Sequence, residues 1–272
     1  MVAVEWQASL FGAAAPAFDP TFDGIERIDL GAGAWIDHLP EWLSGHDEVM
    51  DELVRVAPWR SGERPMYDRI VAIPRLTAWW RAPFPAPAPP ILEDMRAALS
   101  ARYGVTLTSV GCNLYRDGQD SVAWHGDRID RNVPLHTIAI VSVGERRKLL
   151  LRPAGGGASM RFDLGAGDLF VMGGTCQRTW EHCVPKVAHA GPRLSITYRH
   201  GMRSDQPGYA ALMADATRDP HQEPENSTVD DWHGQKVDRM MDQAEDMPAE
   251  GVGTDTNDAQ TDAEAEFNAE KG

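Results

Sequence analysis

The chain is poor in cysteine, lacks a long apolar run and has no excess of basic residues, and each shortage excludes a class of protein. Its three cysteines, Cys112, Cys176 and Cys183, form no CxxC spacing, which argues against a disulfide framework and for a reducing compartment. No apolar stretch approaches the roughly 20 residues that span a bilayer. The N-terminal MVAVEWQASLFGAAAPAF has an acid where a signal peptide is basic. We therefore expect a cytoplasmic protein that does not contact a membrane, and we favour a monomer.

Negative charge is abundant but unevenly distributed. Residues 201–272 hold 18 of the 41 acids and 5 of the 26 bases, so this stretch carries −13 of the net charge of −15. The remaining residues are close to neutral, and the low pI therefore does not exclude a nucleic-acid partner for them. We expect residues 204–272 to form an acidic, mostly disordered tail. A less favoured alternative is an acidic segment that lies on a basic groove and competes with nucleic acid.

The first third of the chain contains two helix patterns. Residues His46–Val56 place apolar side chains at helical spacing, with Ser44 as a possible cap. Residues Pro90–Tyr103 repeat that spacing and end at Gly104, a good stop signal. Between them, the proline-rich PRLTAWWRAPFPAPAPP at residues 74–90 is expected to lack regular structure.

From Thr106 onward the pattern changes to short strand-like runs separated by glycine-containing turns. Several short strands at close spacing indicate an all-β sandwich or barrel in this part of the chain. The expected strands are residues 106–115, 136–143, 147–153, 159–164, 168–173 and 193–199.

The stretch WHGD contains a histidine and a carboxylate that could face one point. Residues two apart on an extended backbone lie on the same side, so His125 and Asp127 can act together. A third donor is available in His182, which lies past four of the expected strands. Two imidazoles and one carboxylate are the donor set of non-haem iron(II) oxygenases. The alternatives remain open here, because an H-x-D pair is common by chance and His182 alone also fits a surface or hydrogen-bonded core histidine.

The run RLSITYR supplies an independent feature. Its odd positions share one face of a strand, and arginine is almost never fully buried unless it is paired. Inside a barrel this face could grip a small dicarboxylate through charge-assisted hydrogen bonds, whereas on a surface it would be an ordinary solvated basic face. Asn113 and Tyr115 share a side of another strand and could donate to the same ligand, or could simply end that strand. The polar face consists of Arg193, Ser195, Thr197 and Arg199.

Taken together, these motifs resemble the AlkB-type iron(II)/2-oxoglutarate dioxygenases over residues 106–200. The resemblance lies in N-x-Y-x-x-G, H-x-D, a downstream histidine and R-x-S-x-T-x-R, in that order. Residues 74–80 also look like the segment that leads into the substrate-binding lid of that family. The chain departs from the family at Ser195, where asparagine is usual, and at Ile129, where many members have a second acid; Asp130 stands next to it. The matching positions are Asn113, Tyr115, Gly118, His125, Asp127, His182, Arg193, Ser195, Thr197 and Arg199.

The resemblance implies an α+β fold with a double-stranded β-helix (jelly-roll) core at residues 105–203 and an N-terminal helical and lid region at residues 1–104, followed by the acidic tail that the composition predicts. It implies that His125, Asp127 and His182 bind Fe(II). It further implies that 2-oxoglutarate chelates the iron and that Arg193 pairs with its distal carboxylate. The residues expected to complete the grip are Asn113, Tyr115, Ser195, Thr197 and Arg199.

By the same resemblance, the reaction is O2-dependent demethylation of an N-alkylated base in DNA or RNA, with release of formaldehyde, succinate and CO2. The base must be flipped out or single-stranded to reach a buried iron. Tyr67, Trp79 and Trp80 could stack on it, or could pack between the helices and the barrel. Two alternatives remain: the same chemistry on a protein or a small molecule, and non-catalytic binding of modified nucleic acid. The arginines that could touch phosphates, or be ordinary solvated surface, are Arg128, Arg131, Arg146, Arg147 and Arg152.

Overall fold

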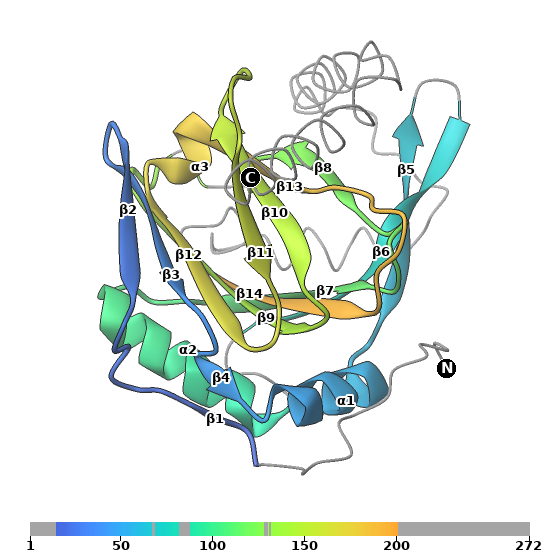
Figure 1. Cartoon of the computed structure of the whole chain (residues 1–272), viewed down its shortest axis with the longest axis horizontal. Coiled ribbons are helices and arrows are strands. Elements are labelled where there is room, and N and C mark those ends of the chain that lie inside the picture. The colour runs from blue at the N-terminus through green and yellow to red at the C-terminus, as the bar shows by residue number, and fades with distance from the viewer. Residues whose placement is uncertain (1–14, 67–68, 82–87, 128–129, 131, 201–272) are drawn as a thin grey trace, which may run out of the picture. The chain divides into compact units, whose positions relative to one another are not determined.

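The structure is a computed structural model that describes residues 15–66, 69–81, 88–127, 130 and 132–200. The described chain is mostly antiparallel β-sheet with few helices (Figure 1). An eight-stranded sheet has the order β2-β3-β12-β9-β14-β7-β6-β5, and a four-stranded sheet has the order β11-β10-β13-β8. The expected tail at residues 204–272 lies outside the described residues.

The larger sheet is built from strands of both halves of the chain. Its N-terminal strands are β2 (Glu26–Gly31), β3 (Ala34–Leu39), β5 (Arg60–Met66) and β6 (Arg69–Arg81). Its other strands are β7 (Ser109–Tyr115), β9 (His136–Gly144), β12 (Asp168–Gly174) and β14 (Arg193–Arg199). The smaller sheet consists of β8 (Val122–His125), β10 (Arg147–Pro153), β11 (Met160–Leu164) and β13 (Trp180–Val184). The short strands β1 (Ala17–Phe18) and β4 (Leu43–Ser44) pair with each other.

The six strands and two helices expected from the sequence are present, with strand ends shifted by a few residues at most. Helix α1 spans His46–Val56 and helix α2 spans Pro90–Tyr103, the ranges that their apolar spacing predicts. Gly45 precedes α1 without a side-chain cap, so the suggested cap at Ser44 is wrong. A four-residue helix, α3 (Cys176–Thr179), was not expected.

The prediction of irregular structure from Pro74 onward is wrong as far as Arg81, because this stretch belongs to strand β6. Pro74 is tolerated because it lies where the pairing of β5 with β6 shifts register, between the pairs Ser61↔Leu76 and Glu63↔Ala72. Its carbonyl accepts the amide of Ser121, 2.8 Å away. The first 104 residues therefore supply four strands of the main sheet in addition to helices.

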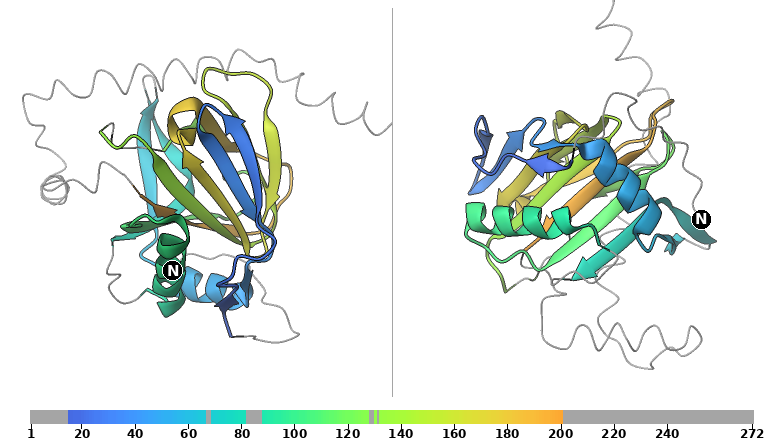
Figure 2. Two further views of the ribbon diagram at one scale, coloured as in Figure 1. Left: turned by 90° about the vertical axis from the view of Figure 1, so that its left-hand side faces the viewer. Right: turned by 90° about the horizontal axis from the view of Figure 1, so that it is seen from below.

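The alternation of apolar and polar residues in β14 separates two environments. Leu194, Ile196 and Tyr198 join the apolar cluster that also contains α1 and α2, and both helices cover one face of the larger sheet (Figures 1 and 2). The opposite residues of β14 face the smaller sheet, and Arg193, Ser195 and Thr197 are buried there. A second apolar cluster, from β3, β9, β12, β10 and β11, fills part of the space between the sheets. The polar face of β14 is thus inside the two-sheet core.

The cysteines and the helices bear on the expectations from composition. Cys112, Cys176 and Cys183 are all buried free thiols. Among the described helices, none combines the length and apolarity needed to cross a bilayer.

Candidate metal and co-substrate site

The expected metal donors come from neighbouring strands of the smaller sheet. His125 ends β8 and His182 lies in β13, where the two residues are direct partners in the antiparallel pairing. Their imidazole ring centroids are 4.3 Å apart. Asp127 follows two residues after His125, and its Oδ2 lies 4.0 Å from Nε2 of His182. The structure therefore brings together three residues that span 57 positions of the sequence.

Burial keeps both imidazoles in the neutral form that binds metals. Burial, with a smaller contribution from the nearby His125, lowers the pKa of His182 to about 3. Burial also lowers the pKa of His125, although the carboxylate of Asp127 opposes this shift. For Asp127, burial acts to raise the pKa, but the opposing interactions, of which that with the Arg199 guanidinium is the largest, make the net shift downward. The set is thus two neutral nitrogen donors and one ionised carboxylate.

The donor set fits a divalent metal, although its side chains would have to close in further to coordinate one. Among the described residues, no three His, Cys, Asp or Glu side chains already form a complete metal-binding cluster. Ligand atoms that each lie about 2.0–2.2 Å from one ion are at most about 4.4 Å apart. The 4.0 Å between Asp127 Oδ2 and His182 Nε2 satisfies that limit. Two imidazoles and a carboxylate are also the ligand types that suit iron(II).

Arg193 is the most unusual residue of the interior. Its side chain is 1% exposed, and its Nη2 donates to Ser142 Oγ over 2.6 Å. Its Nε and Nη1 are buried with no hydrogen-bond partner. Burial lowers its pKa, with the nearby Tyr115, whose ring centroid lies 5.3 Å from the guanidinium carbon, opposing the shift. A buried cation with unused donors is costly unless an anion completes it, and a carboxylate matches its planar fork.

Asn113 lies beside Ser195 across the β7–β14 pairing and is oriented by a residue that the sequence did not reveal. Arg75 Nε donates to Asn113 Oδ1 over 3.0 Å, and Arg75 Nη1 donates to the carbonyl of Ser121 over 3.2 Å. The amide nitrogen of Asn113 therefore points the other way, toward Ser195 Oγ at 3.4 Å. In consequence Asn113 presents donors to the interior, as binding a carboxylate requires. No local signal marks Arg75, because its partner Asn113 is 38 residues away.

Arg199 and Thr197 complete the polar face of β14. Arg199 Nε donates to Asp127 Oδ1 over 3.2 Å, which ties this face to the metal donors. The guanidinium lies above Gly111, where an added Cβ would be 2.7 Å from Nη1. Thr197 is 3% exposed and pairs with Gly111. The glycine thus leaves the space that lets Arg199 cross the neighbouring strand to reach Asp127.

The two tryptophans expected near the substrate occupy opposite environments. Trp79 is 50% exposed and lies beside Gly111, next to the guanidinium of Arg199. Trp80 is 5% exposed and belongs to the apolar cluster with α1 and α2, so its suggested role in base stacking is wrong. The difference follows from the strand, because successive residues point to opposite faces. Tyr67 and Arg128 lie outside the described residues.

The arginines suggested as phosphate contacts differ in exposure and in the groups they contact. Arg147 is 3% exposed and donates to the carbonyls of Asp117, Asp120 and Pro185, so that suggestion is wrong for it. Arg152 lies over the Trp124 ring, 4.1 Å from its centroid. Arg146 is half exposed beside Asp168. Arg131 is outside the described residues.

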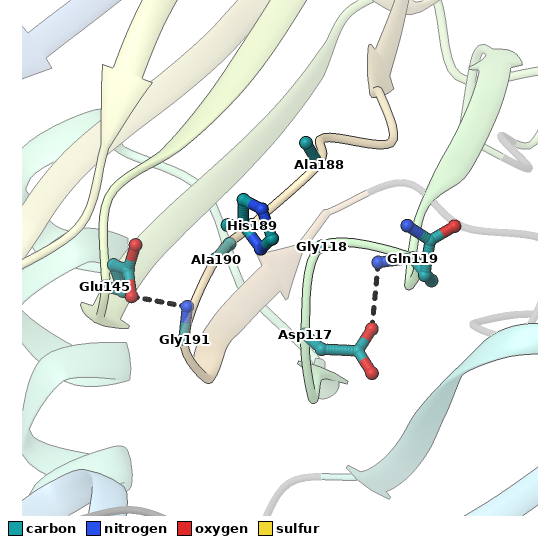
Figure 3. A pocket seen from close by; sticks show the side chains of 8 residues that line it. All are labelled: Asp117, Gly118, Gln119, Glu145, Ala188, His189, Ala190 and Gly191. Atoms are coloured by element: carbon teal, nitrogen blue, oxygen red, sulfur yellow. Dashed lines mark hydrogen bonds between the residues drawn. The ribbon is translucent and has the colours of Figure 1, made fainter.

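A surface hollow of about 440 Å³ lies between three loops near the start of β14 (Figure 3). None of the expected metal or co-substrate residues except Gly118 of the N-x-Y-x-x-G motif lines it. In Figure 3 the Gly191 amide donates to Glu145 and so joins two of the loops, while the Gln119 amide donates to Asp117 within the third loop. Arg147 donates to the Asp117 carbonyl, and its guanidinium carbon lies 5.8 Å from the centroid of the Tyr115 ring. We therefore place the site between the sheets and not in this hollow.

The sequence is similar to those of known proteins over much of the described chain. A family model described as the 2OG-Fe(II) oxygenase superfamily matches residues 75–199. "Alpha-ketoglutarate-dependent dioxygenase alkB homolog 3" of Bos taurus is 32% identical over 196 residues, and that of Homo sapiens is 31% identical over the same length; the alignment covers 65% of this chain and 66% of each relative. "DNA oxidative demethylase ALKBH2" of Arabidopsis thaliana is 29% identical over 215 residues, covering 64% of this chain and 68% of the relative. The chain belongs to the 2OG-Fe(II) oxygenase superfamily, as a member of its AlkB type.

Proposed function

We propose that the chain is an Fe(II)/2-oxoglutarate-dependent dioxygenase that demethylates N-alkylated bases in DNA or RNA, with release of formaldehyde, succinate and CO2. One observation carries the proposal: a single strand face, that of β14, bears both the buried and incompletely paired Arg193 and the Arg199 that contacts Asp127. An anion site and a metal-donor set therefore share one interior. The relatives named as dioxygenases and DNA demethylases support the reaction and the substrate class.

Each residue has a defined task in this function. His125, Asp127 and His182 would hold the iron, which when bound activates O2 for oxidation of the methyl group. Arg193 would grip the distal carboxylate of 2-oxoglutarate through its unused Nε and Nη1. The inner residues Asn113, Tyr115, Ser195 and Thr197 would donate to the same co-substrate. Ser195 is shorter than the asparagine usual in the family, and the amide of Asn113 points into the space beside it.

The charge of the interior suits an anionic co-substrate. Arg199 donates to the Asp127 carboxylate, whereas Arg193 is buried and donates to the neutral Ser142 hydroxyl, with its Nε and Nη1 left without a hydrogen-bond partner among the described residues. A carboxylate of the co-substrate would supply a counter-charge for Arg193, whereas a neutral ligand would leave an unpaired buried cation.

The target base would reach the site at the exposed Trp79. An indole that is half exposed beside Arg199 offers a stacking surface next to the metal donors. A base in a duplex must leave the helix to reach it, so we propose a single-stranded or flipped base as the substrate. We further propose that the protein acts in the cytoplasm as a monomer and that residues 204–272 are a solvated tail.

Succinate formation tests the proposal against its alternatives. The protein is titrated anaerobically with Fe(II) and 2-oxoglutarate and then exposed to O2 with an N-methylated single-stranded oligonucleotide, free methylated nucleosides or methylated peptides. We expect succinate and formaldehyde in equal amounts with the oligonucleotide. Turnover confined to peptides or nucleosides would favour another substrate class. Oligonucleotide binding that survives chelation, with no succinate, would favour a binding module.

A further inference from the structure

Helix α3 lies between the elements that carry two of the proposed metal ligands. It precedes β13, which contains His182, and its side chains face the segment that follows β8 and contains Asp127. We propose that Gln177 of α3 is a positioning residue that fixes the backbone of Asp127 for metal binding. The inference rests on the proposed function, because it assigns Asp127 as a metal ligand.

The hydrogen bond that carries the inference is short and buried. Gln177 Oε1 accepts the backbone N–H of Asp127 over 2.8 Å, across 50 residues of sequence. Gln177 is 7% exposed, and its Nε2 donates to Sδ of Met172 over 3.5 Å. The weak donor contact to sulfur and the strong acceptor contact to the amide together fix which end of the side chain faces Asp127. An amide side chain is therefore suited to this position.

Two further features bring α3 close to the described residues on either side of Asp127. A Cβ on Gly126 would lie 3.1 Å from the carbonyl oxygen of Gln177, so this glycine lets the backbone approach the helix closely. Arg178, the next residue of α3, donates from Nη2 to the carbonyl of Val133 over 2.7 Å. Residues of α3 thus accept from Asp127 directly and donate to Val133 six residues later.

The consequence for Asp127 is that both its main chain and its side chain are fixed. Arg199 holds Oδ1 at 3.2 Å, and Gln177 holds the backbone N–H. With those two points set, Oδ2 is directed toward His182. Groups that orient a metal ligand in this way contribute about tenfold to a hundredfold to metal affinity in other proteins. We expect Gln177 to contribute within that range.

The test uses the full chain with Co(II) in place of iron, so that binding is measured without turnover. Gln177→Met keeps the length and volume of the side chain but removes the strong acceptor. Gln177→Glu keeps an acceptor oxygen. Thr179→Val is the matched control, because the Thr179 hydroxyl donates to the carbonyl of Thr175, the N-cap residue of α3. Co(II) affinity is measured by calorimetry and by the visible spectrum, and amide hydrogen exchange at Asp127 is followed in the metal-free protein.

We expect Gln177→Met to weaken Co(II) binding by about tenfold to a hundredfold and to remove the exchange protection of the Asp127 amide. Gln177→Glu should stay closer to the wild type in both measurements. Thr179→Val should match the wild type in Co(II) affinity and in exchange protection, even if the melting temperature of this variant falls. Wild-type Co(II) affinity in Gln177→Met, or equal losses in Gln177→Met and Thr179→Val, would overturn the positioning role and leave the proposed function standing. A wild-type protein that binds no Co(II) would overturn both.

Discussion

Arg199 and Asp127 form the contact that joins the co-substrate strand to the metal donors. The guanidinium Nε of Arg199 donates to Oδ1 of Asp127 over 3.2 Å, while Oδ2 of the same carboxylate lies 4.0 Å from Nε2 of His182. The two oxygens thus have separate partners, which favours a carboxylate that binds metal through one oxygen. Arg199 also helps to keep the buried carboxyl ionised, because it lowers the pKa that burial would raise.

The first prediction concerns the glycine beneath this contact. Gly111→Ala would place a Cβ 2.7 Å from Nη1 of Arg199 and push the guanidinium away from Asp127. We expect Co(II) affinity to fall by about tenfold, as for loss of other groups that orient a metal ligand. A double-mutant cycle with Arg199→Met gives the control, because the alanine should have no further effect once Arg199 is gone. If the losses of Co(II) affinity from the two substitutions were additive, Gly111 would act independently of Arg199.

Much of the fold could be predicted because the signals are local. The apolar alternation of β14 and the helical spacing of α1 identified those elements directly. Strand β13 was not expected, since Trp180–Val184 is short and has no clear alternation. Strand β6 was missed in part because Pro74 indicates irregular structure unless the register shift of its partner strand is known.

The same distinction between local and long-range signals applies to the residues of the site. His125 and Asp127 are suggested by their spacing and His182 by its place after four expected strands, but His182 becomes a neighbour of the other two only through the pairing of β13 with β8. Arg75 and Gln177 were not predicted, because each acts through one hydrogen bond to a residue 38 or 50 positions away. Long-range pairing of this kind leaves no periodic trace in a single sequence.

The second prediction concerns the cost of keeping Arg193 buried. Arg193→Met should lower 2-oxoglutarate affinity by more than about thirtyfold, since truncating one partner of a buried charge pair costs about 2 kcal/mol or more. Co(II) affinity should not change. The metal-free variant should be at least as stable as the wild type, because each buried donor without a partner costs about 1–3 kcal/mol.

Calorimetric titration and chemical unfolding of the metal-free protein measure these effects. Arg147→Met is the matched control, because that buried guanidinium donates to three backbone carbonyls and its loss should destabilise the fold. If Arg193→Met lost stability as Arg147→Met does, then Arg193 would be a structural residue and its proposed co-substrate role would fail.

The third prediction concerns acid stability of the metal-free protein. The pKa of His182 falls to about 3 in the folded state and that of His125 is also lowered, so below an ordinary pKa of 6.5 the unfolded chain takes up protons that the folded chain refuses. Stability is therefore full above that pH and is lost as the pH falls toward about 3. Each imidazole contributes at most about 1.4 kcal/mol per pH unit. The lowered pKa of Asp127 acts in the same direction, below 3.8.

Guanidinium unfolding at pH 7, 5.5 and 4 measures this slope. His182→Gln removes one of the two imidazoles, and its unfolding free energy should fall less steeply between pH 6.5 and 4 than that of the wild type. An unchanged slope in this variant would mean that His182 is protonated in the folded protein and is not held as a neutral donor.

The last prediction separates the two neighbouring tryptophans. Trp79 is 50% exposed and Trp80 is 5% exposed, so the same substitution should have opposite consequences at the two positions. Trp79→Ala should leave the unfolding free energy nearly unchanged and raise KM for a methylated single-stranded oligonucleotide, since stacking on one base contributes about 1–3 kcal/mol. The KM for 2-oxoglutarate should not change.

Trp80→Ala provides the matched control, because it removes a large side chain from the apolar cluster and should cost about 3–5 kcal/mol of stability. Its KM for the oligonucleotide, measured well below its melting temperature, should stay near that of the wild type. Because both residues lie in β6 and differ only in the face they occupy, a general disturbance of the strand would affect KM in both variants alike. A rise in KM confined to Trp79→Ala would instead locate base binding at the exposed indole beside Arg199.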